Sequence, residues 1–144
     1  MHANLTTVEA WERAEGAPFP LGATWVVDGA AWNIAVYSRD ATAVSVLLYG
    51  DDPARPLATI VLDPLINKTG RIWHCMVSAA RVPGARHYAL RVDGPRGPRM
   101  RFMPGKVLTD PFARRLWFPP EFSREAARGE APNDGRAVLG VLPT

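Results

Sequence analysis

Residues 86–115 read RHYALRVDGPRGPRMRFMPGKVLTDPFARR, and this stretch decides the fold class. Tyr, Leu and Val alternate with other residues over 87–92, which is the period of a strand with one buried face. The strand stops at Asp93-Gly94-Pro95, because glycine tolerates a positive φ and proline lacks the backbone donor that a sheet needs. The stretch closes on Asp110-Pro111, a corner with an aromatic residue behind it. A strand, a Pro/Gly hairpin and a corner together predict a β-domain in which turns fix the strand register.

The rest of the chain repeats this pattern of short apolar runs separated by turns. Fourteen prolines and twelve glycines mark the turns, and Asp28-Gly29 is a two-residue hairpin signal between two of the runs. The run at 44–49 is apolar on both faces, which places it in the middle of a sheet. The sequence therefore predicts an all-β fold, an immunoglobulin-like antiparallel β-sandwich. Besides 87–92, we expect strands at 23–27, 31–39, 44–49, 59–62 and 71–78, with a last apolar run at 136–142.

This pattern divides the chain into three segments. Residues 1–17 are polar and form an N-terminal extension, which is either a frayed tail or a short docked helix. Residues 18–115 form the β-sandwich. Residues 116–144 form a C-terminal segment, in which Ser123 fits the cap of a helical turn at 121–128.

Composition indicates a soluble globular protein and narrows its partners. The 144 residues are 47 % apolar and 22 % charged, which is enough for one hydrophobic core. The net charge of +3 is spread along the chain, whereas nucleic-acid binders gather basic residues on one face, so we expect no nucleic-acid partner. The N-terminus lacks the basic start and apolar run of a signal peptide, and no apolar stretch reaches the length of a membrane span. We therefore expect a cytoplasmic protein without membrane contact.

The titratable residues suggest neither a metal site nor a catalytic group. The single cysteine, Cys75, cannot form an internal disulfide or a cysteine-pair metal site, and the three histidines lack metal-ligand spacing. His74 and Cys75 are neighbours on one strand, which predicts an outward histidine and a buried thiol. Most aspartates stand beside glycine or proline, where a carboxylate usually bonds its own backbone. We expect no catalytic residue, no metal and no cofactor.

Several motifs follow one another along the chain: PFPLGATW at 18–25, IWH at 72–74, RVDGP at 91–95, RFMPGK at 101–106 and LTDPFA at 108–113. Together they resemble the N-terminal domain of isoamylase-type glycogen-debranching enzymes of glycoside hydrolase family 13, a domain of carbohydrate-binding module family 48. The resemblance covers roughly residues 18–113. Two motifs depart from the family: Tyr-Gly-Tyr-Arg is replaced by Tyr88-Ala89-Leu90-Arg91, and Asn-Pro-Asn-Lys by Met103-Pro104-Gly105-Lys106.

The resemblance implies a role as well as a fold. In debranching enzymes of this type the nucleophilic aspartate and the acid/base glutamate lie on a following (β/α)8 barrel, which takes about 250 residues. This chain ends before such a barrel could begin, so we expect a non-catalytic accessory domain of α-glucan metabolism. Its expected partners are a catalytic barrel and, weakly, α-glucan, and a bare docking face would allow homodimers. Two alternatives stay open: a freestanding glucan-binding module, and a protein-interaction sandwich without sugar contact.

Five tryptophans are the remaining functional candidates. A sugar ring presents flat C–H faces and a rim of hydroxyls, and an exposed indole offers an apolar face with one N–H donor. Trp32 and Trp73 share strand parity with apolar neighbours, so we expect them in the core. Trp25 and Trp117 show no such parity, and some relatives hold α-glucans with surface tryptophans, a lysine and an asparagine. The expected carbohydrate-binding residues are therefore Trp25, Trp117, Asn33 and Lys106.

Overall fold

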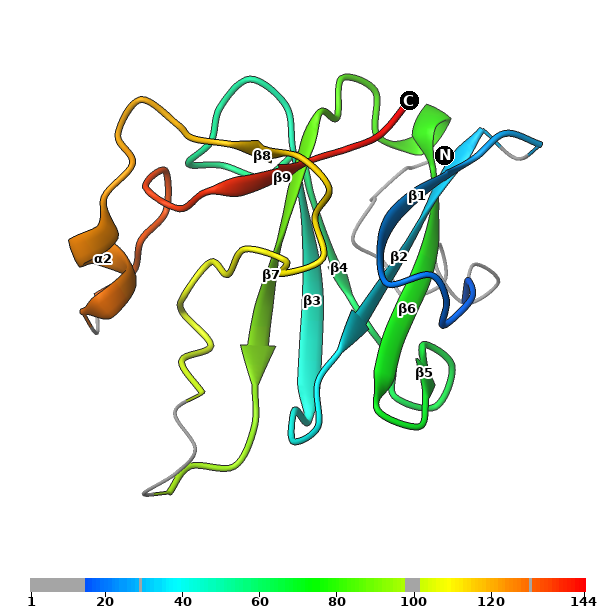
Figure 1. The fold of residues 1–144 in the computed structure, drawn as a ribbon, viewed down its shortest axis with the longest axis horizontal. Coiled ribbons are helices and arrows are strands. Elements are labelled where there is room, and N and C mark those ends of the chain that lie inside the picture. The colour runs from blue at the N-terminus through cyan, green and yellow to red at the C-terminus, as the bar shows by residue number, and fades with distance from the viewer. Residues whose placement is uncertain (1–14, 29, 98–101, 130) are drawn as a thin grey trace.

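The computed structural model describes residues 15–28, 30–97, 102–129 and 131–144, and it consists of two antiparallel sheets packed face to face (Figure 1). The elements are β1 (Gly22–Val26), β2 (Ala31–Tyr37), β3 (Ala43–Tyr49), β4 (Ala58–Val61), β5 (Lys68–Thr69), β6 (Ile72–Ser78), the 3-10 helix η1 (Ala79–Arg81), β7 (His87–Asp93), β8 (Leu116–Trp117), α2 (Arg124–Arg128) and β9 (Leu139–Val141). The first sheet has the order β1-β2-β6-β5 and the second has the order β4-β3-β7-β9-β8. The predicted all-β antiparallel sandwich is confirmed.

The strand predicted at 87–92 is β7, and it organises the second sheet. β7 pairs with β3 along its whole length, from Tyr49 opposite His87 to Ala43 opposite Asp93. β9 pairs with the other edge of β7, and farther along that edge the returning chain forms an isolated bridge at Leu108. β3 lies between β4 and β7, which confirms the central position predicted from its apolar residues on both faces.

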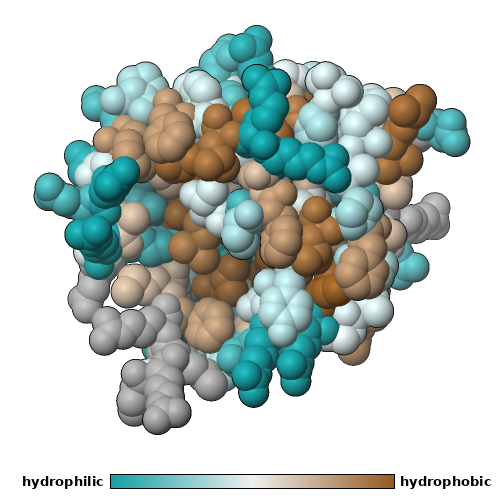
Figure 2. Space-filling model, in the orientation of Figure 1, coloured by the Kyte–Doolittle hydropathy of each residue, from teal (hydrophilic) through white to brown (hydrophobic). Residues whose placement is uncertain are grey.

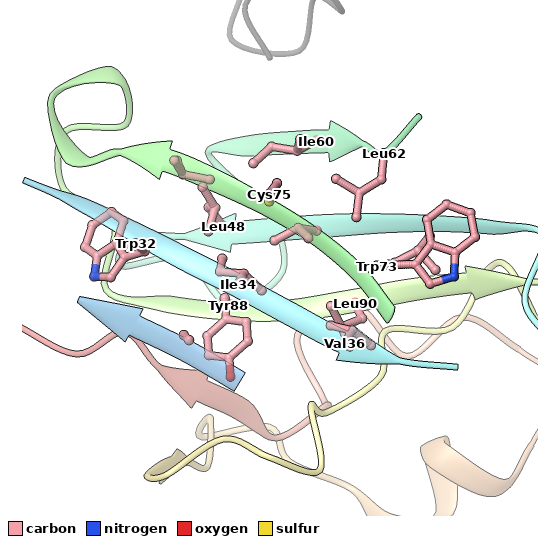
Figure 3. Close-up of a cluster of buried hydrophobic side chains, with 14 of the residues drawn as sticks. Trp32, Ile34, Val36, Leu48, Ile60, Leu62, Trp73, Cys75, Tyr88 and Leu90 are labelled. Carbon is pink, nitrogen blue, oxygen red and sulfur yellow. The ribbon is translucent and has the colours of Figure 1, made fainter. Parts of the chain in front are cut away.

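The main hydrophobic core fills the space between the two sheets. Trp32 and Trp73 are both buried in it, as their strand parity predicted, and they lie toward opposite ends of the cluster in Figure 3. Cys75 is fully buried between the sheets, and burial raises the pKa of its thiol to about 12. A thiol that stays protonated at neutral pH is not a nucleophile, so Cys75 is a packing residue.

His74 points away from Cys75, but it is buried rather than exposed, which corrects the prediction of an outward histidine. The chain before β1 crosses the outer face of the first sheet and covers the ring. Nδ1 donates to the carbonyl oxygen of Glu15 at 2.5 Å, and Nε2 accepts from the hydroxyl of Thr69 at 2.8 Å. Both ring nitrogens of His74 are thus paired. Residues 1–14 of the expected N-terminal extension lie outside the described residues.

A second, smaller hydrophobic cluster lies on the outer face of the second sheet. β8 and β9 extend this sheet, and the residues around them cover its outer face. The second sheet therefore includes two strands, β8 and β9, from the expected C-terminal segment at 116–144. The physical reason is that their apolar side chains bury a sheet face that would otherwise meet water. The cluster consists of Leu47, Tyr49, Ala89, Val107, Ala137 and Leu139, with Trp117 packed against it.

Two locally predicted features are confirmed. Ser123 caps α2, because its hydroxyl oxygen accepts from the backbone N–H of Ala126 at 3.2 Å. Asp110 forms a corner in which one carboxylate oxygen accepts from the backbone N–H of Phe112 at 2.9 Å. The other carboxylate oxygen accepts from the buried hydroxyl of Tyr88 at 2.6 Å, a bond that the sequence did not predict. This bond ties β7 to the corner that follows it.

Candidate functional site

Trp25 lies on β1, at the edge of the first sheet, and is partly buried. Its ring meets that of Trp32 edge to face, with the centroids 5.5 Å apart and the planes at 61°. The indole also packs against the main core. Much of the apolar surface of the Trp25 indole is therefore already packed against other side chains of the domain.

Trp117 lies on β8, at the edge of the second sheet, and is also partly buried. Its ring stacks on that of His87, with the centroids 4.5 Å apart and the planes at 17°. Burial lowers the pKa of His87 below its ordinary value, because desolvation disfavours the charged imidazole. A neutral ring therefore backs the indole at neutral pH and fixes its orientation.

Asn33 and Lys106 are buried, at 4 % and 3 % exposure, and both bind backbone groups. The amide of Asn33 accepts from the N–H of Ala17 at 2.7 Å and donates to the carbonyl oxygen of Ala17 at 3.0 Å. The amine of Lys106 donates to the carbonyl oxygens of Ala126 and Ala131. Buried polar groups need partners, and the chain itself supplies them here, so the sugar contact expected of these two side chains stays a prediction.

The expected sugar-binding residues are spread over the fold and do not converge. Trp25 and Asn33 lie on β1 and β2 of the first sheet, whereas Trp117 lies on β8 of the second. Lys106 lies on the segment that connects β7 to β8. What the structure does bring together around Trp117 is a set of turn residues that the sequence did not single out.

The hollow beside β8, here called the Trp117 pocket, has a volume of about 450 Å³. Three segments far apart in the sequence meet there: the turn after β3, the chain between β8 and α2, and the turn before β9. Turn aspartates such as Asp51 and Asp52 were expected to bond their own backbone, and the fold brings the turn at Asp134 to the same hollow. The lining consists of Asp51, Asp52, Pro53, Ala54, Trp117, Pro120, Glu121, Asp134, Gly135 and Arg136.

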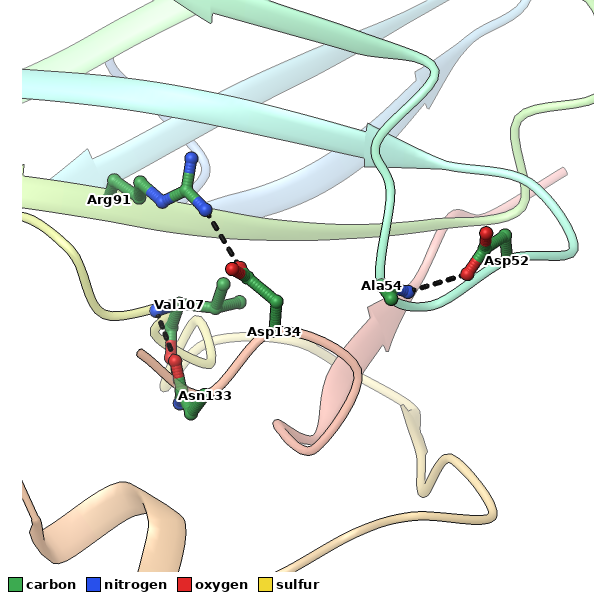
Figure 4. A network of polar contacts seen from close by, with 6 residues as sticks. All are labelled: Asp52, Ala54, Arg91, Val107, Asn133 and Asp134. Carbon is green, nitrogen blue, oxygen red and sulfur yellow. Dashed lines mark hydrogen bonds and ion pairs between the residues drawn. The ribbon is translucent and has the colours of Figure 1, made fainter. Parts of the chain in front are cut away.

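Two carboxylates of the Trp117 pocket, Asp52 and Asp134, accept hydrogen bonds from nearby groups (Figure 4). Asp52 accepts from the backbone N–H of Ala54 at 2.9 Å, which is the turn bond expected for an aspartate beside proline. One oxygen of Asp134 accepts from the guanidinium of Arg91 at 2.8 Å. These bonds orient the two side chains, which lie far apart in the sequence.

A second hollow, here called the apolar groove, opens between the end of β2 and the chain that follows β7. Its volume is about 420 Å³, and core residues such as Val36 and Leu90 form its floor. Tyr37 and Leu108 line it and are 50 % and 41 % exposed. Figure 2 shows apolar side chains across the middle of the face that Figure 1 turns toward the viewer. Exposed apolar patches are typical of surfaces that bind other molecules.

The described ranges contain neither a metal-binding cluster nor a membrane-spanning helix. Within them, no group of three or more histidines, cysteines or acidic residues is placed to hold a metal ion. Likewise, none of their helices has the length and apolar character needed to cross a membrane. The cytoplasmic location stays a prediction.

Comparison with known families identifies the family of this chain. Residues 20–113, more than half of the chain, match the family model of carbohydrate-binding module 48, the isoamylase N-terminal domain. The chain belongs to the carbohydrate-binding module 48 family. The resemblance inferred from the motif order is confirmed. The family match ends before Trp117 and the turn at 134–136, so much of the Trp117 pocket lies beyond the matched part of this module 48 domain.

The relatives of this module 48 domain are far longer proteins. Isoamylase SU1, chloroplastic, of Zea mays is 36 % identical over 133 residues, which cover 89 % of this chain and 16 % of the relative. The glycogen debranching enzyme of Pectobacterium carotovorum is 38 % identical over 107 residues, which cover 73 % of this chain and 15 % of the relative. The chain thus spans about one sixth of their length.

A solved structure supports the fold of the module 48 domain independently. The pullulanase SAP of group B Streptococcus superposes with a TM-score of 0.60 at 17 % identity, covering 92 % of this chain and 16 % of the pullulanase. At this identity the similarity concerns the fold alone.

Proposed function

We propose that this chain is a non-catalytic accessory domain of α-glucan debranching, which packs on a catalytic barrel of glycoside hydrolase family 13. The observation that carries the proposal is the module 48 match over 20–113, together with relatives named isoamylase and glycogen debranching enzyme. Those relatives are about six times longer than this chain, which leaves ample length for a catalytic domain of about 250 residues. The apolar groove supports the second half of the proposal, since a docking domain needs a surface that loses water on assembly.

The purified chain is expected to release no reducing sugar from glycogen or amylopectin. Glycoside hydrolysis needs two carboxyl groups at a defined separation around a bound sugar, and one of them must stay protonated. The aspartates of the described chain that serve turns, such as Asp52 and Asp110, already accept backbone N–H bonds within their own turns. A reducing-end assay against a mock purification checks this. Sugar release that copurifies with the chain would overturn the non-catalytic assignment.

The apolar groove is expected to make the isolated domain self-associate. Tyr37 and Leu108 present apolar surface that a barrel would cover, and without the barrel a second copy can cover it. Leu108→Ser should raise the dissociation constant of the dimer at least tenfold, which corresponds to about 1.4 kcal/mol. Sedimentation velocity over a concentration series measures this constant.

Leu65→Ser is the matched control, because Leu65 is almost fully exposed on a loop outside the groove lining. It should leave the dimer unchanged. Tyr37→Ser gives a second test at the groove rim. Equal dissociation constants for all three variants and the parent chain would remove the groove as a docking face.

A further inference from the structure

We propose that the free edge of β4 pairs antiparallel with β4 of a second copy of this chain, which joins two β-sandwiches through one continuous sheet. The paired segment is 57–62, and the pairing is centred on Thr59. This inference goes beyond the proposed function, because it concerns a different surface and a different partner. β4 lies at the opposite edge of the second sheet from β8, outside the lining of the apolar groove.

The outer edge of β4 presents backbone groups to which no strand is paired. β4 pairs with β3 on one side, and within the described residues no strand pairs with its other side. On the β3 side, Leu62 donates its N–H to the carbonyl oxygen of Val44 at 3.0 Å. Backbone groups alternate in direction along a strand, so those of Ile60 also point toward β3, whereas those of Thr59 and Val61 point outward. An edge of this kind is a template for another strand.

The segment that forms this edge has the composition of a strand that pairs with itself. Residues 57–62 read LATIVL, without a charge, a proline or a glycine. Short uncharged segments of high β-propensity pair readily with copies of themselves when they are exposed at a sheet edge. Leu57 and Val61 point outward and are 47 % and 59 % exposed. Ala58 and Ile60 alternate with them and are buried in the core, so the inner face is packed while the edge stays open.

The other edges of the two sheets are protected, which distinguishes β4 from them. β1 lies against the returning chain: a Cβ at Gly22 would lie 2.7 Å from the carbonyl oxygen of Phe112, and Ala23 shares a hollow with residues 141–144. β5 and β8 are two residues long, and Lys68 adds a charge to β5. Coverage, short length and charge are the usual protections of an edge strand. β4 is longer than β5 and β8, carries no charge, and is not covered by another strand of the described chain.

A pairing centred on Thr59 matches the edge with itself. The N–H of Thr59 then meets the C=O of Thr59 in the second copy, and the N–H of Val61 meets the C=O of Leu57 in that copy. The exposed side chains of Leu57 and Val61 become cross-strand neighbours, so each removes apolar surface of the other from water. A shift by one residue would place them on opposite faces, which disfavours that register. Pro56 and Pro64 flank the segment and end the ladder there, because proline lacks an N–H donor.

Charges just outside the paired segment favour the same register. The pairing centred on Thr59 brings Arg55 opposite Asp63 of the second copy, and the two-fold symmetry repeats this pair at the other end. Arg55 is exposed, and within the described residues neither side chain forms an ion pair. One carboxylate oxygen of Asp63 accepts from the backbone N–H of Leu65 at 2.9 Å, which orients the carboxylate. Complementary charges at both ends of a self-complementary strand identify the partner as a second copy of this chain.

Sedimentation equilibrium of the Leu108→Ser chain, in which the contact through the apolar groove is weakened, tests the inference. This chain should still form dimers, with a dissociation constant on the order of 0.1 mM, because the edge contact is small. Val61→Lys added to it should raise this constant at least tenfold, since it places a charge on the edge opposite an apolar side chain. Val27→Lys is the matched control, because Val27 is an exposed valine next to β1, and it should leave the constant unchanged.

An exchange of charges tests the register in the same Leu108→Ser chain. Arg55→Glu and Asp63→Lys should each raise the dissociation constant of the homodimer about fivefold or more, because like charges then face each other. An equimolar mixture of these two variants should recover dimers, since the introduced charges have opposite signs and meet across the pair. Melting curves followed by circular dichroism check that both variants are folded. If Asp63→Lys is not, Arg55→Glu and Val61→Lys decide the result.

The outcomes separate this inference from the proposed function. No dimer of the Leu108→Ser chain at roughly 1 mM, or equal dissociation constants with Val61→Lys and Val27→Lys, would overturn the edge contact. A mixture of folded charge variants that fails to recover dimers would do the same. The docking role depends on the effect of Leu108→Ser in the parent chain and survives these results. If Leu108→Ser has no effect there while Val61→Lys weakens the dimer, the docking role is rejected and the edge contact stands.

Discussion

Replacing Trp73 with alanine is expected to lower the free energy of unfolding by about 3–5 kcal/mol, which would leave a domain of this size largely unfolded or barely stable. Trp73 has no exposed surface, and its side chain fills one end of the core between the sheets (Figure 3). Its indole N–H has no partner within the described residues, so the loss comes from packing and not from a broken hydrogen bond. The amine of Lys68 lies 4.9 Å from the ring centroid, and its cation–π contact would be lost as well.

Urea denaturation followed by circular dichroism measures this loss. Trp25→Ala is the matched control, because Trp25 is the partly buried tryptophan of the same sheet. It should cost clearly less than Trp73→Ala, since part of its surface already meets water. A Trp73→Ala variant with an unchanged denaturation midpoint would mean that this indole is not in the core.

The fold could be predicted because its main signals are local. The alternation along β2, β6 and β7 correctly predicts which side chains of each strand face the core. The turn residues between the strands set the strand register. The short strand β8, just past residue 115, was not predicted, and the reason is nonlocal. β8 is two residues long and carries no periodicity, and its place in the second sheet depends on pairing with β9 more than twenty residues later.

The candidate site could be predicted only in part, because the hydrogen-bond partners of polar residues lie far away in the sequence. Asn33 and Lys106 look like surface groups in the sequence, yet each satisfies backbone atoms 16 to 25 residues away. His74 was misplaced for the same reason, since the chain segment that covers it lies 59 residues earlier. Trp117 was identified from its lack of core parity, but the turns that complete its pocket are brought to it by tertiary structure alone.

The bond between Tyr88 and Asp110 gives a second large effect, and Tyr88→Phe tests it. Both residues are buried, and the hydroxyl of Tyr88 donates to the carboxylate of Asp110 at 2.6 Å. Burial and the bond to Asp110 raise the pKa of Tyr88 well above its ordinary value, so the hydroxyl keeps its proton at neutral and alkaline pH. Removing it leaves a buried carboxylate oxygen without this donor, which should cost about 1.5–3 kcal/mol of stability.

Tyr37→Phe is the control for this loss, because the side chain of Tyr37 is half exposed and its hydroxyl makes no hydrogen bond within the described residues. It should change stability by less than about 0.5 kcal/mol. A double-mutant cycle with Asp110→Asn, measured by urea denaturation, isolates the pair and should give a coupling energy of about 1–3 kcal/mol. A coupling near zero would show that the corner at Asp110 holds without β7. In that case the backbone bond from Phe112, and not the Tyr88 hydroxyl, fixes the chain where it turns toward β8.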